Sequence, residues 1–261
     1  TLPLTLFPYT TLFRSFIKDN YTSWFLKEKS QRPQLSHEII KENVFPLIKN
    51  KPVFFILIDN LRLDQWFIIK PLIEEFFTLK TEKTYCSILP TATQYSRNAI
   101  FSGLMPSDIY KKNPDLWVDD IDDGGKNLYE SELLEKLLNF FRIDCKTSFN
   151  KILNLNAGKK LVNHVNDLLN NNLNIIVYNF VDILSHAKTE IKMIKELANN
   201  EKSYRDLTYT WFKNSPLFSF LKELSTKNAE VIITTDHGTI NVNQPIQIID
   251  RKSTRLNSSH Q

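Results

Sequence analysis

The stretch that decides the fold is AEVIITTDHG, residues Ala229–Gly238. Residues 230–234 are rich in β-branched side chains and lack polar alternation, which favours a strand covered on both faces of a parallel sheet. Asp236 and His237 follow directly, and ligand sites of open α/β sheets lie just outside the carboxyl ends of the strands. An acid and an imidazole in this place are a candidate metal corner, and a turn with a helix cap is the alternative.

Both ends of the chain are predicted to be foreign to the natural protein. Residues 5–15, TLFPYTTLFRS, match the translation of a common sequencing-library adapter, and residues 250–260, DRKSTRLNSSH, match the opposite adapter. Such segments are excluded from fold reasoning, as expression tags are. We therefore assign residues 1–15 and 250–261 to adapter sequence, and residues 16–249 to a natural segment that is cut at both ends.

Removing these ends changes the charge balance. The whole chain has 33 Lys and Arg against 29 Asp and Glu. The adapter-like ends hold four of the bases and one of the acids, which leaves 29 bases against 28 acids in the natural segment. A net charge of +1 predicts no general affinity for nucleic acid or for membranes.

The remaining length suits one α/β domain with a sizeable core. No apolar run approaches the length of a membrane span, so we expect no membrane partner. Cys86 and Cys145 form no CxxC pair and are predicted to be reduced, buried cysteines of a cytoplasmic protein. The five glycines build no GxGxxG, Walker or GxSxG motif, which excludes the usual nucleotide-binding loops and the serine-hydrolase elbow.

The pattern along the chain predicts how the domain is organised. Residues 16–51 are expected to form short linker helices, and residues 52–249 the domain itself. Apolar runs predict strands at residues 52–58, 85–89, 145–149, 173–179 and 230–234. Helical spacing is expected at residues 61–76, 93–103, 128–141, 158–170 and 188–224. This alternation predicts an α/β fold with a mostly parallel central sheet flanked by helices.

Two further strands deliver polar groups at their carboxyl ends. Asp59 follows the strand at 52–58, where it is either a helix N-cap or a metal ligand. Asp182 and His186 follow the strand at 173–179 and are four residues apart, so a helical turn would place them on one face. They could coordinate one metal ion, or they could form an ordinary pair on the surface.

Thr93 stands at the expected start of the helix at 93–103. Helix N-termini present free N–H groups and a positive dipole, which suits a phosphoryl group, so this hydroxyl is either an N-cap or a nucleophile. Gly103 and Pro106 are expected to stop the helix. Because parallel strands end at one edge of a sheet, a two-metal site could form from Asp59, Thr93, Asp182, His186, Asp236 and His237.

Four segments carry a resemblance to a known family. IDNLRLDQW, ILPTATQYSRNAIFSGLMPS, NFVDILSHA and TTDHG occur in this order and resemble the PglZ domain of the alkaline phosphatase superfamily. Within that family the chain looks like PorX-type proteins, in which a response-regulator receiver precedes the PglZ domain. The resemblance covers nearly all of residues 16–249 and implies an alkaline-phosphatase-like fold that is truncated at its C-terminus.

The resemblance also implies two zinc ions. The first would be held by Asp59, Thr93, Asp236 and His237. The second would be held by Asp182, by His186 and by a later histidine that lies beyond residue 249, so the second site lacks one ligand in this segment. Arg97 and Asn98 follow the nucleophile and are expected to face substrate oxygens.

The implied activity is that of a zinc-dependent phosphodiesterase or phosphatase domain of a two-component response regulator. Thr93 would attack phosphorus and form a phospho-enzyme, and a nucleotide or an oligonucleotide is the implied phosphodiester substrate. The segment itself is expected to be nearly inactive, because its second zinc lacks a ligand. A homodimer through the missing receiver domain is the implied assembly. The alternative is a non-catalytic PglZ domain that serves as a signalling scaffold or binds partners.

Overall fold

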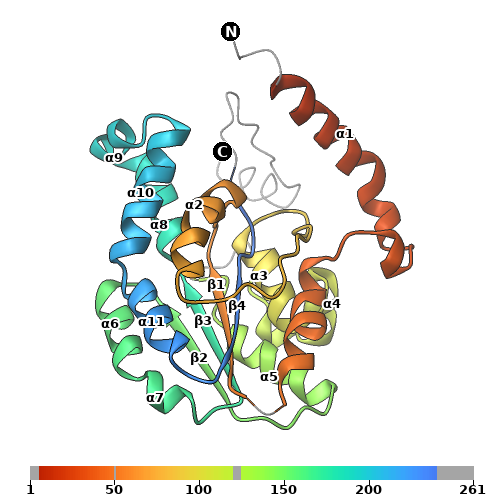
Figure 1. Cartoon of the computed structure of the whole chain (residues 1–261). Helices are drawn as coiled ribbons and strands as arrows, with labels where there is room; N and C mark the ends of the chain where they lie inside the picture. Colours follow the sequence, from red (N-terminus) through yellow and green to blue (C-terminus); the bar gives the residue numbers. More distant parts are fainter. Residues whose placement is uncertain (1–5, 50, 120–124, 240–261) are drawn as a thin grey trace, which may run out of the picture.

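The computed structural model describes residues 6–49, 51–119 and 125–239. All strands of its central sheet run parallel, in the order β2-β3-β1-β4. They are β1 (Val53–Ile58), β2 (Thr147–Ile152), β3 (Leu173–Tyr178) and β4 (Glu230–Thr234). Helices cover both faces of this sheet (Figure 1). The predicted α/β fold with a parallel sheet flanked by helices is confirmed.

The central strands are apolar throughout because their side chains alternate between two cores. In β1, Phe54 and Ile56 pack into one core, whereas Phe55 and Leu57 pack into the other. The first core is covered by α2 (Leu63–Glu74), α6 (Leu155–Asn163), α7 (Val165–Leu168), α10 (Glu201–Asn214) and α11 (Pro216–Ser225). The second is covered by α3 (Thr93–Ser102), α4 (Pro106–Lys112) and α5 (Glu130–Phe140). Figure 1 shows the two groups on opposite sides of the sheet.

Strand β4 has the predicted bounds but not the predicted burial. All its side chains are half-buried, whereas those of β1 and β3 are buried throughout. Among the described strands β4 pairs with β1 alone, so it lies at an edge of the sheet. Val231 and Ile233 nevertheless pack against the first core and Ile232 against the second, so both faces of β4 are covered as predicted, but only in part.

Two other expectations need correction. The predicted strand at 85–89 does not form, and this segment has only an isolated parallel bridge between Leu35 and Cys86. Cys86 and Cys145 are free thiols, as predicted, but both are half-buried rather than buried. By contrast, α3 stops where expected, because Gly103 takes the left-handed backbone (φ 65°) that commonly ends helices.

The chain before β1 forms helix α1 (Leu6–Trp24) and then short turns of 3-10 and π-helix, at Lys29–Gln31, Ser36–Glu38, Ile40–Val44 and Phe45–Leu47. A further 3-10 turn, Pro114–Leu116, follows α4. Ile39, Ile40 and Val44 are buried in the second core. Helix α1 stands away from the sheet (Figure 1). The adapter origin of the first residues stays a prediction, and residues 250–261 lie outside the described part of the chain.

Two more helices, α8 (Phe180–Glu190) and α9 (Lys192–Leu197), follow β3. They stand beyond the carboxyl end of that strand, above the sheet in Figure 1. None of the helices that the structure describes has the length and apolar character needed to cross a membrane.

Candidate metal centre

Strand β1 carries Asp59 to the carboxyl edge of the sheet, where its side chain is 1% exposed. Helix α2 begins only at Leu63, with Arg62 in the N-cap position, so Asp59 does not cap a helix. The intervening Asn60 has a left-handed backbone (φ 60°), which Asn and Gly adopt more readily than other residues. This sharp turn after β1 leaves the Asp59 carboxylate at the strand end.

Asp236 and His237 arrive beside Asp59 because β4 and β1 are neighbouring strands. His237 Nε2 lies 3.7 Å from Asp59 Oδ1 and 3.9 Å from Asp236 Oδ2. The backbone N–H groups of Asn60 and His237 donate to Asp236 Oδ1, at 3.2 and 3.0 Å, and fix that carboxylate. One ligand atom from each of Asp59, Asp236 and His237 lies within 4.8 Å of the others, and all three residues are buried.

Thr93 adds a hydroxyl to this group. It is the first residue of α3, whose N-cap is Ala92, so the hydroxyl does not cap the helix. Instead Thr93 Oγ1 lies 2.9 Å from His237 Nε2, within hydrogen-bonding distance. The Thr93 side chain is half-buried, so a substrate could reach it from solvent.

The environment of the Asp59 carboxylate favours binding of a metal cation. Burial raises the pKa of Asp59 to about 7, the Asp236 carboxylate adds to this rise, and the Arg97 guanidinium partly offsets it. Asp59 Oδ1 is buried and has no hydrogen-bond partner within the described residues. An unpartnered buried carboxylate oxygen is costly, and a metal ion would relieve that cost. The ligand set consists of two carboxylates and one imidazole, and in the part of the chain that the structure describes Asp59 Oδ1 has no hydrogen-bond partner to displace. Such a set fits a divalent cation such as zinc.

Arg97 lies one helical turn after Thr93 and is 2% exposed. Its guanidinium forms ion pairs with Asp59 and Asp236, the second through Nε at 2.9 Å from Oδ2. Burial alone would lower the pKa of Arg97, but the attraction of these carboxylates raises it, so the group stays charged. Arg97 therefore contacts the candidate ligands themselves, and its predicted contact with substrate stays a prediction.

Asn98 is also buried next to this cluster. Its Oδ1 accepts a hydrogen bond from Asn127 Nδ2 at 3.1 Å, and Asn127 Nδ2 also lies 3.1 Å from the carbonyl oxygen of Thr93. The predicted contact of Asn98 with substrate oxygens is not tested by these contacts.

The second predicted ligand pair lies on α8. Asn60 Nδ2 reaches Asp182 Oδ1 at 3.5 Å, which links Asp182 to the cluster around Asp236. His186 Nε2 lies 3.7 Å from Asp182 Oδ2, as expected for residues four apart on a helix, and its side chain is 67% exposed. The structure thus brings together Asp59, Thr93, Asp236 and His237. Asp182 is linked to this cluster through the side chain of Asn60, and the side chain of His186 is mainly exposed.

Sequence reasoning missed three residues of this region. Asn60 could have been found, because it directly follows a strand and Asn tolerates the left-handed backbone of such a turn. Glu130 is fully buried and forms an ion pair with Lys151. In the sequence, Glu130 resembles an ordinary acid at the start of a helix, and Lys151 resembles an ordinary base of an edge strand. Nothing in the local pattern signals their burial or their pairing.

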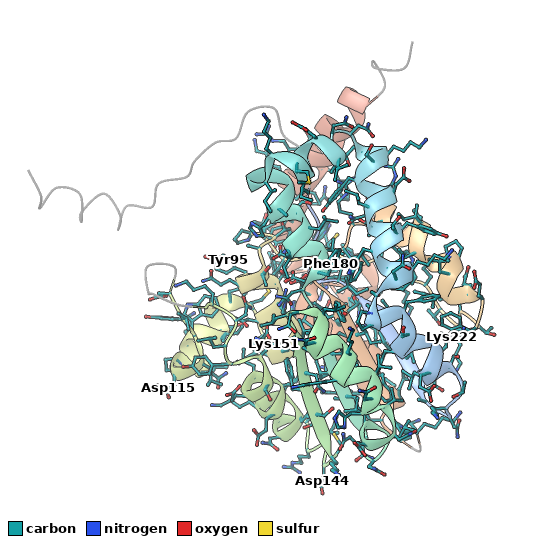
Figure 2. The ribbon with its side chains drawn as sticks, turned by 90° about the vertical axis from the view of Figure 1, so that its left-hand side faces the viewer. Tyr95, Asp115, Asp144, Lys151, Phe180 and Lys222 are labelled. Carbon is teal, nitrogen blue, oxygen red and sulfur yellow. The ribbon has the colours of Figure 1, made fainter. Side chains whose placement is uncertain are left out.

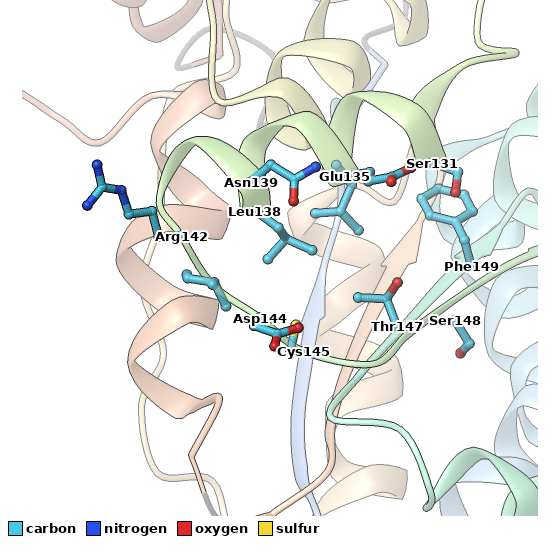
Figure 3. Close-up of a pocket in the computed structure, with 12 residues that line it drawn as sticks. Ser131, Glu135, Leu138, Asn139, Arg142, Asp144, Cys145, Thr147, Ser148 and Phe149 are labelled. Atoms are coloured by element: carbon cyan, nitrogen blue, oxygen red, sulfur yellow. The ribbon is translucent and has the colours of Figure 1, made fainter.

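A cavity of about 490 Å³ lies away from this cluster (Figure 3). Its walls come from α5, the turn that follows and the start of β2, including Leu138, Cys145 and Thr147. Asp144 of this cavity lies at the bottom of the molecule in Figure 2, and Phe180 at the start of α8 lies far above it. None of the predicted site residues lines the cavity, so it is separate from the candidate metal centre.

Comparison with known proteins gives one family match. A family model described as the BREX system PglZ alkaline phosphatase-like domain matches residues 39–261. No curated protein matches the chain. The matched range contains every residue of the cluster described above.

Proposed function

The chain belongs to the family of PglZ alkaline phosphatase-like domains, and we propose that it is a zinc-dependent phosphodiesterase-type hydrolase domain with Thr93 as nucleophile. The family suggests hydrolase activity in general. The observation that most supports the finer proposal is the Thr93 hydroxyl 2.9 Å from His237 Nε2, beside buried carboxylates. A hydroxyl that does not cap its helix is free for this role.

The ligands divide into two groups. Asp59, Asp236, His237 and Thr93 would hold one zinc ion, and Asp182 with His186 would supply two ligands to another. When bound, the ions would act as Lewis acids that stabilise charge on phosphoryl oxygens and lower the pKa of an oxygen ligand. The resemblance implies a further histidine as the third protein ligand of the second ion.

The residues of the chain then have distinct tasks. Thr93 Oγ1 loses its proton and forms a bond to phosphorus while the bond to the leaving oxygen breaks, and that oxygen takes up a proton to leave as an alcohol. Water later cleaves the phosphothreonine, which restores the hydroxyl and releases a phosphate monoester. The free N–H groups at the start of α3 bind the transferred phosphoryl group. Asn60 and His237 hold the Asp236 carboxylate with their backbone N–H groups throughout.

The biological setting is proposed from the resemblance alone. The PorX-like motifs support a cytoplasmic response regulator that forms a homodimer through a receiver domain. They also support a phosphodiester substrate such as a nucleotide or an oligonucleotide. In that setting phosphorylation of the receiver would drive dimerisation and contacts with partners.

One observation favours a second candidate, a non-catalytic signalling scaffold. Arg97 pairs with both Asp59 and Asp236, so a cation of the chain itself neutralises these acids. A domain stabilised in this way could keep its fold without binding any metal.

The two candidates are separated by measuring zinc content and hydrolysis of a nitrophenyl phosphodiester. We expect the uncut natural protein to bind zinc and release nitrophenol, and the 261-residue chain to be nearly inactive. A natural protein that contains no zinc after purification in its presence would support the scaffold and contradict the hydrolase.

A further inference from the structure

Glu130 is a buried carboxylate that the proposed reaction does not use. It is the first residue of α5 and is fully buried. Its Oε2 lies 2.6 Å from Lys151 Nζ, and its Oε1 lies 3.6 Å from Arg97 Nη1. Lys151 forms a close ion pair with Oε2, whereas the contact of Oε1 with Arg97 is too long for a hydrogen bond, and within the described residues neither oxygen has a further hydrogen-bond partner. A buried carboxylate with such incomplete partners calls for an explanation.

Arg97 connects this carboxylate to the candidate metal ligands. Its guanidinium pairs closely with Asp59 and Asp236, and only loosely with Glu130. A guanidinium has five N–H donors and stays charged in proteins, so it can serve carboxylates on different sides. Arg97 is thus a buried cation shared among three acids, two of which are candidate metal ligands.

We propose that Glu130 is a positioning residue of the candidate metal centre, which takes up the Arg97 guanidinium when a divalent cation binds Asp59 and Asp236. This inference rests on the metal centre of the proposed function. A divalent cation and a guanidinium repel each other when both lie at the same two carboxylates, the more strongly because the site is buried.

The movement that this requires is small. Arg97 Nη1 and Glu130 Oε1 are 3.6 Å apart, and a hydrogen bond between charged groups has a length of about 2.8 Å. A shift of less than about 1 Å would therefore turn the loose contact into a strong one. The same shift would lengthen the contacts of Arg97 with Asp59 and Asp236, and so weaken the repulsion between the guanidinium and a metal ion bound at these carboxylates.

Lys151 sets how strongly Glu130 attracts Arg97. It lies in β2 next to the strand end, is 30% exposed, and is on the face turned to the viewer in Figure 2. Its ammonium shares Glu130 with Arg97. Without the charge of Lys151, Glu130 would pair with Arg97 alone and attract it more strongly. Without the charge of Glu130, Arg97 would pair only with Asp59 and Asp236. The two changes should alter metal affinity in opposite directions.

The test is the affinity of the 261-residue chain for Zn²⁺, measured by competition with a chromophoric chelator. Glu130→Gln should weaken zinc binding by about 10–100-fold, the usual effect of losing a partner behind the metal ligands. Lys151→Met should tighten zinc binding. Glu132→Gln is the matched control, since it removes the same charge from an exposed position of α5 and should leave the affinity unchanged.

Thermal unfolding without metal shows whether each variant folds. Unchanged zinc affinity in Glu130→Gln, or weaker binding in both variants, overturns the proposal. If Glu130→Gln does not fold, Lys151→Met decides, because unchanged or weaker binding there also overturns it. A parental chain that binds no zinc contradicts the metal centre and this inference together. Zinc binding without phosphodiester hydrolysis by the natural protein contradicts only the proposed reaction.

Discussion

The Thr93 hydroxyl lies 2.9 Å from Nε2 of His237, although 144 residues separate them in the chain. The contact exists because Thr93 is the first residue of α3 and His237 lies three residues past the end of β4, which pairs with β1. It joins a candidate nucleophile to a candidate metal ligand. A metal ion bound there could lie close to the hydroxyl oxygen and lower the pKa of the hydroxyl.

Replacing this hydroxyl tests the nucleophile. In the natural protein Thr93→Ala should lower phosphodiester hydrolysis by about 10³-fold or more, because the attacking atom is lost. Thr93→Ser keeps a hydroxyl and should retain part of the activity. Both variants should unfold near the parental temperature, since Thr93 does not cap α3. Parental turnover by Thr93→Ala would rule out the covalent mechanism.

Asn60 is predicted to couple the two ligand groups. Asn60→Gly keeps the left-handed backbone but removes the amide that reaches Asp182 at 3.5 Å. In the natural protein we expect weaker binding of the second zinc ion and little change at the first, seen as a lower zinc-to-protein ratio in titrations.

Asn60→Ala is the companion variant. It also removes the amide and adds backbone strain of about 1 kcal/mol, which thermal unfolding should reveal. If both variants bind two zinc ions with parental affinity, the amide of Asn60 has no role in coupling.

The Glu38 carboxylate is expected to make the stability of the fold depend on pH in the acid range. Burial alone would raise its pKa, but the Arg32 guanidinium and the Leu35 N–H lower it to about 2. The charged carboxylate therefore stabilises the fold fully above pH 4.5, its ordinary pKa, and this contribution is lost as the pH falls toward 2. Glu38→Gln should flatten the dependence of the melting temperature on pH in this window. An equally steep dependence in the variant would show that other acids cause it.

A side chain at position 103 is expected to destabilise the fold. The φ of 65° at Gly103 is unfavourable for residues with a Cβ, and a Cβ there would lie 2.6 Å from Leu137 Cδ1. Gly103→Ala should lower the free energy of unfolding by about 1–3 kcal/mol, measured by urea denaturation. Gly125→Ala, whose backbone has no positive φ, is the control and should cost less. Equal losses in the two variants would show that backbone strain at Gly103 is not the cause.

Much of the fold follows from local sequence. The apolar β-branched run at 230–234 predicts β4 with its observed bounds, and Gly103 predicts the end of α3. Such features are determined by residues close together in the chain, because side-chain periodicity and backbone freedom act over a few residues. The same locality explains why Asp59 and Asp236 could be assigned to strand ends.

The pattern of residues was not enough where burial depends on distant segments. It could not show that β4 lies at an edge of the described sheet, since a strand's neighbours come from other parts of the chain. For the same reason residues 85–89, which have the composition of a strand, found only a single bridge to Leu35. Both features depend on pairing partners rather than on propensity.

The sequence by itself determined which chemical groups stand at the strand ends and at the start of α3: two acids and an imidazole after the strands, and a hydroxyl on the helix. Only the tertiary structure decided how their charges are balanced. Arg97 bridges Asp59 and Asp236, and Glu130 lies behind Arg97. These residues come from separate helices and strands, and the strength of their ion pairs depends on distance and burial, which no spacing along the chain encodes.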